Sequence, residues 1–208
     1  QTRVTVSSVD DATSLLDKLG ILDHVLLKLV NRPEAAVHKL RIALSEVRRG
    51  YDALQDALLK IDLLSFEKQD IEDTREELQK IAAGKIKLTM AEAKGSCTRI
   101  GNIYDKYLQG WFSAALNPGE ADELRLLFND LRYTDAGLLK ASMRLSIQAE
   151  AKATEILNHL KTAGGETRAR RAAEEFSLQF RRTLEKLTKQ LVFMLELENK
   201  LIQITGVP

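Results

Sequence analysis

Two stretches of this chain carry apolar residues at alternating steps of three and four, without interruption. Steps of this kind place one apolar side chain on the same helix face at every turn, and long helices pack along such a seam at shallow crossing angles. The two seams are Val37, Leu40, Leu44, Val47, Tyr51, Leu54, Leu58 and Ile61, and Ile86, Met90, Ala93, Cys97, Ile100, Tyr104, Tyr107 and Trp111. The pattern favours long packed helices over a sheet.

The same spacing, together with cap and turn residues, predicts six helices along the chain. We expect them at residues 9–30, 34–63, 66–83, 86 to the turn at 117, 120–162 and 166–204. Ser65 is expected to cap the third helix. Gly84 is expected to bend the chain, because the apolar seam shifts its phase by one residue there. Gly137 falls midway along the fifth helix, where it can bend that helix.

These helices predict an all-α fold, an elongated antiparallel bundle with heptad-type packing in which about six helices build four columns. The last two helices set its length, since forty helical residues span about 60 Å. The shorter helices would stack end to end against them, the first with the second and the third with the fourth. We expect residues 9–208 to form a single domain, because 208 residues with 44% hydrophobic content suffice for one core.

Residues 1–8 are set apart from the bundle and are expected to be disordered or the remnant of a fusion. The run from Val4 to Ser8 resembles the closing residues of an antibody heavy-chain variable domain. Gln1 is also consistent with the new end left by a removed signal peptide. The compartment therefore stays open: the cytoplasm is favoured, and a secreted or periplasmic location follows if Gln1 is a processed end.

Charge and cysteine content exclude several classes of protein. The 31 basic and 30 acidic residues leave a net charge of +1, which gives no global field to attract nucleic acid. The basic residues of the last helix are interleaved with glutamates, so we expect no nucleic-acid partner. One cysteine excludes an internal disulfide. Because Cys97 lies on a seam, it is interpreted as a buried thiol that packs as a small hydrophobe.

The sequence offers no constellation typical of an enzyme. His24, His38 and His159 do not pair with one another at helical spacing, and no Glu-x-x-His motif occurs. A glycine-rich phosphate loop and a Gly-x-Ser-x-Gly elbow are also absent. We therefore expect no catalytic residues, no cofactor and no metal ion.

Two groups of residues are candidate functional surfaces. Aromatic side chains with polar tips crowd the end of the fourth helix among small residues, where they can line a ligand or partner surface: Tyr104, Tyr107, Trp111 and Phe112. The first helix is apolar on most of its circumference, which indicates either enclosure by other helices or insertion into a membrane. Its seam includes Leu15, Leu19, Leu22, Leu26 and Leu29.

These observations favour a non-enzymatic interaction module, a scaffold, adaptor or oligomerisation domain that acts through protein–protein contacts. We expect a protein partner, and self-association into a homo-oligomer is one form of it. One alternative is a membrane-active bundle that releases its first helix into lipid, since the overall plan looks like that of cell-death and pore-forming bundles. The other alternative is an extracytoplasmic bundle that senses a ligand.

Overall fold

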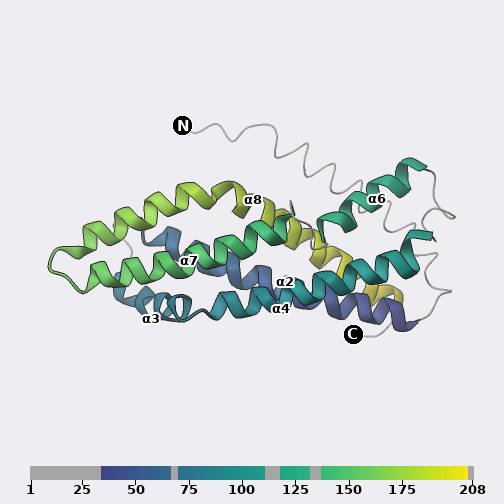
Figure 1. Cartoon of the computed structure of the whole chain (residues 1–208), viewed down its shortest axis with the longest axis horizontal. Helices are drawn as coiled ribbons and strands as arrows, with labels where there is room; N and C mark the ends of the chain where they lie inside the picture. The colour runs from purple at the N-terminus through teal and green to yellow at the C-terminus, as the bar shows by residue number, and fades with distance from the viewer. Residues whose placement is uncertain (1–33, 67–69, 111–117, 132–136, 206–208) are drawn as a thin grey trace.

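The computed structural model describes residues 34–66, 70–110, 118–131 and 137–205, and every element in these ranges is helical (Figure 1). The elements are α2 (Glu34–Leu63), α3 (Ile71–Ala82), α4 (Lys85–Ile103), the π-helix η1 (Tyr104–Leu108), α6 (Pro118–Asp130), α7 (Leu138–Leu160) and α8 (Gly165–Thr205). The predicted bounds of the second and last helices, 34–63 and 166–204, agree with α2 and α8 to within a residue.

The helices pack as an antiparallel bundle. α2 packs most extensively against α4 on one side and α8 on the other, and α7 packs against α8, α3 and α4. α3 and α4 follow one another along the same side, with α7 running beside both (Figure 1). The prediction of an all-α helical bundle with antiparallel neighbours is confirmed for the described residues.

The two seams form the core of the bundle. Every seam residue whose side chain the structure describes is buried, from Leu40 to Ile61 in α2 and from Ile86 to Tyr104 in α4 and η1. They join one hydrophobic cluster with residues of α7 and α8 such as Ala149. Burial of this continuous apolar surface is the main source of the bundle's stability.

A glycine inside α2 sets how closely α2 approaches α4. A Cβ atom at Gly50 would lie 2.8 Å from the Ala93 Cβ and 3.2 Å from the Thr89 carbonyl oxygen. Both neighbours belong to α4, and neither is the free end of a flexible side chain. The two helices therefore touch with backbone against backbone at this point, which requires the missing side chain.

The cap of α3 differs from the prediction. Asp70, and not Ser65, caps this helix, since the Asp70 carboxylate accepts a hydrogen bond of 2.9 Å from the Glu72 backbone N–H. The Ser65 hydroxyl instead donates to the Asp62 carbonyl at the end of α2. A serine hydroxyl can hydrogen-bond to the backbone at the end of one helix or at the start of the next. The position of Ser65 in the sequence therefore does not predict which helix it contacts.

The predicted bend at Gly84 is confirmed. Gly84 joins α3 to α4 with φ of +84°, a left-handed conformation that glycine adopts without steric cost. Gly164, with φ of +65°, likewise lies in the predicted turn between α7 and α8. The chain can therefore reverse or change direction at both points.

The single helix predicted for 120–162 is wrong, because α6 ends at Asp130 and α7 begins at Leu138. Gly137 caps α7 with extended backbone, φ −77° and ψ 164°. The apolar seam lapses in the sequence between these helices, where Thr134 and Asp135 stand at seam positions. A continuous helix would have placed these two polar side chains on its buried face.

The fourth helix also departs from the prediction at its carboxyl end. It is α-helical to Ile103, widens into the π-helix of η1, and is α-helical again at Gln109 and Gly110. A π-helical turn holds more residues than an α-helical turn, so the seam spacing of three and four does not continue through it. The Tyr104 ring, at the start of η1, stacks on the Phe128 ring of α6 with 4.9 Å between centroids.

Candidate functional site

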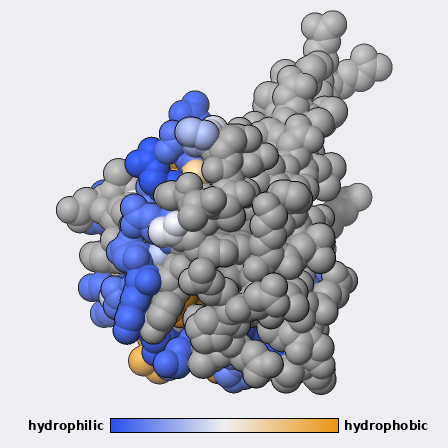
Figure 2. Space-filling view, turned by 90° about the vertical axis from the view of Figure 1, so that its right-hand side faces the viewer, coloured by the Kyte–Doolittle hydropathy of each residue, from blue (hydrophilic) through white to orange (hydrophobic). Residues whose placement is uncertain are grey.

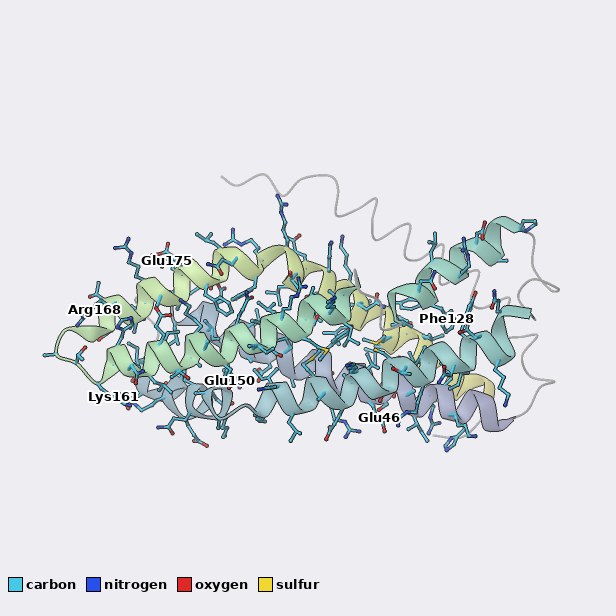
Figure 3. All side chains as sticks on the ribbon, viewed as in Figure 1. Glu46, Phe128, Glu150, Lys161, Arg168 and Glu175 are labelled. Atoms are coloured by element: carbon cyan, nitrogen blue, oxygen red, sulfur yellow. The ribbon has the colours of Figure 1, made fainter. Side chains whose placement is uncertain are left out.

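The structure describes part of the predicted aromatic site. Tyr104 is only 3% exposed and stacks on Phe128, which Figure 3 labels on α6 beside the end of α4. Tyr104 therefore joins α6 to the bundle core. The side chain of Tyr107, and Trp111 and Phe112, lie outside the described residues. The ligand or partner surface proposed for these aromatic residues stays a prediction.

The candidate insertion helix lies outside the described residues as well, with its seam Leu15, Leu19, Leu22, Leu26 and Leu29. Among the helices that are described, from α2 to α8, none has the length and apolar character needed to span a membrane.

Two clefts in the described part of the structure lie between helices. One, of about 400 Å³, lies between the start of α7 and α8 and is lined by Gly137, Leu138, Lys186, Lys189 and Gln190 among others. The other, of about 370 Å³, lies between α2 and α4 and is lined by Glu46, Arg49, Thr89, Glu92 and Arg99. In the second cleft, acidic and basic side chains alternate, which neutralises its charge.

The second cleft is held by a polar cluster around Glu46, which Figure 3 labels on α2. The Ser96 hydroxyl donates to the Glu46 carboxylate at 2.5 Å, and the Arg99 guanidinium of α4 pairs with the same carboxylate. Ser96 is buried. The cluster therefore joins α2 to α4 beside the close contact at Gly50, and its hydrogen bonds are satisfied within the bundle.

The single cysteine is buried in the core as predicted. Cys97 has no exposed surface, and this burial raises the pKa of its thiol to about 12. A raised pKa favours the neutral thiol in the fold. The neutral Cys97 thiol therefore stabilises the fold fully below about pH 8.5, the ordinary pKa of a thiol. This stabilisation is lost as the pH rises from there toward the raised pKa of the folded state.

We expect the folded protein to resist thiol reagents. At pH 8, the raised pKa and burial should slow labelling of Cys97 by at least on the order of a thousandfold relative to the unfolded chain, because the thiolate is the reacting species. The measurement is the rate of reaction with an aromatic disulfide reagent, with protein in concentrated urea as the control. Equal rates in the two samples would show that Cys97 is accessible in the fold.

Three polar contacts fix how α2 lies against α8. The Arg48 Nε donates to the Glu198 carboxylate at 2.9 Å, and the Gln55 amide donates to the Thr188 hydroxyl at 2.7 Å. Further along, the Arg170 guanidinium donates to the Phe66 carbonyl at 2.6 Å. The hydrogen bond to Glu198 raises the pKa of Arg48, so this guanidinium stays charged. The contacts set an antiparallel register in which Gln55 lies beside Thr188 and the end of α2 lies near Arg170.

Apolar side chains lie on the outer side of this helix pair. Leu59, Leu63 and Phe66 stand at steps of four and three, so they share one face of the end of α2 and its following turn. Leu63 and Phe66 are 46% and 58% exposed, and Leu178 of the neighbouring helix α8 is 64% exposed. We call these four residues the outer apolar patch: Leu59, Leu63, Phe66 and Leu178.

Charged side chains flank the outer apolar patch on both helices. On α2, Asp52 and Asp56 are exposed and pair with Arg48 and Lys60 of the same helix. On α8, Arg181 is exposed, and so are Glu174 and Glu185, which lie on the same face at helical spacing. The face therefore carries both acidic and basic side chains on each helix, with apolar side chains next to them.

The apolar seam of the sequence does not indicate this patch, because the seam marks only the buried face of α2. The available signal was that Leu59 and Leu63 are apolar but fall between seam positions. Large apolar residues that lie off the seam and repeat at helical spacing are candidates for a second contact surface. Large apolar side chains are also exposed on other helices, among them Leu88, Leu126 and Ile147. Figure 2 views the end where α2 begins, and the coloured atoms there are mostly hydrophilic with a few hydrophobic ones among them.

The described helices form an all-α bundle in which α2 and α8 present an outer face with both apolar and charged side chains. Within the described ranges, no group of three or more His, Cys, Asp or Glu side chains is placed to hold a metal ion. Comparisons with protein-family models, with curated proteins and with solved structures find no match for this chain.

Proposed function

We propose that this protein is a non-enzymatic interaction module, an elongated bundle of four helical columns with heptad-type packing that binds protein through the outer face of α2 and α8. The observation that carries the proposal is the outer apolar patch. Leu63, Phe66 and Leu178 are each about half exposed or more, although the bundle has a well-buried core elsewhere. Exposed apolar side chains gathered on one face, with charges at the rim, are typical of protein contact surfaces.

The shape of the face also supports the proposal. Two antiparallel helices side by side leave a shallow groove between their axes, which lie about 8–10 Å apart. An amphipathic helix fits such a groove through residues spaced like its own seam. The polar contacts from Arg48 and Arg170 hold the two helices in one register. The surface is therefore formed before binding, which lowers the entropic cost of association.

Site-specific photo-crosslinking tests this function. A photoreactive amino acid placed at Leu63 should form covalent adducts with protein in cells that produce the chain. The matched control is the same amino acid at Leu88, which is 67% exposed but lies on α4, away from the face. We expect adducts at 63 to exceed those at 88 by at least tenfold. Equal yields at the two positions would contradict the proposal.

A further inference from the structure

We draw no further inference here: the strongest candidate, the cleft between the amino-terminal turn of α7 and the Lys186–Gln190 segment of α8, is an uncapped helix end beside exposed lysine side chains, and nothing else in the described part of the structure indicates a ligand there.

Discussion

Replacing Phe180 with alanine is expected to lower the free energy of unfolding by about 3–5 kcal/mol, which is the usual cost of removing a buried aromatic ring. Phe180 is buried in the core of α8 and packs edge to face on Phe176, with 5.1 Å between ring centroids. The substitution removes this pair and leaves a cavity that neighbouring helices cannot close without moving. Urea unfolding followed by circular dichroism measures the change.

The control for this prediction lies two residues earlier on the same helix. Leu178→Ala removes an exposed side chain and should change the free energy of unfolding by no more than about 0.5 kcal/mol. Both variants are compared at the same protein concentration. Equal losses for the two variants would mean that α8 does not present Phe180 to the core.

Replacing Gly50 with alanine is expected to destabilise the bundle by about 1–3 kcal/mol, although alanine is the better helix former. The added Cβ would lie 2.8 Å from the Ala93 Cβ, so α2 and α4 must move apart along part of their contact. That contact is the most extensive between any two helices in the described part of the bundle. Urea unfolding measures this loss as well.

Gly95→Ala is the matched control, because a Cβ at Gly95 in α4 would meet no atom within 4 Å. It should raise the free energy of unfolding by up to about 1 kcal/mol through helix propensity alone. The same substitution is therefore expected to have opposite signs at two helical glycines. A gain in stability at both positions would show that α2 and α4 lie further apart than described.

Most of the fold is predictable from the sequence because its cause is local and periodic. The seams of α2 and α4 repeat at every turn, so burial from Leu40 to Tyr104 follows from spacing alone. Glycine at 84 marks a change of direction for the same reason, since the phase of the seam changes there. In each case several neighbouring residues favour the same structure.

The remainder depends on contacts between distant residues. Nothing near Gly50 in the sequence shows that Ala93 will lie against it, and the partner of Glu46 is fifty residues away in Ser96. Leu63 and Leu178 likewise belong to neighbouring helices only because α2 packs on α8. Periodicity specifies which face of a helix is buried, but it does not specify what lies beside that helix.

The contact between Arg170 and the end of α2 has a consequence for synthesis of the chain. The Arg170 guanidinium donates to the Leu64 and Phe66 carbonyls, more than one hundred residues earlier. During translation, α2 leaves the ribosome long before α8. The side of α2 that packs on α8, and the carbonyls at its end, therefore have no α8 contact until the last helix has been made. α2 can pair with α4 first, and the bundle closes only when the carboxyl-terminal helix has been made.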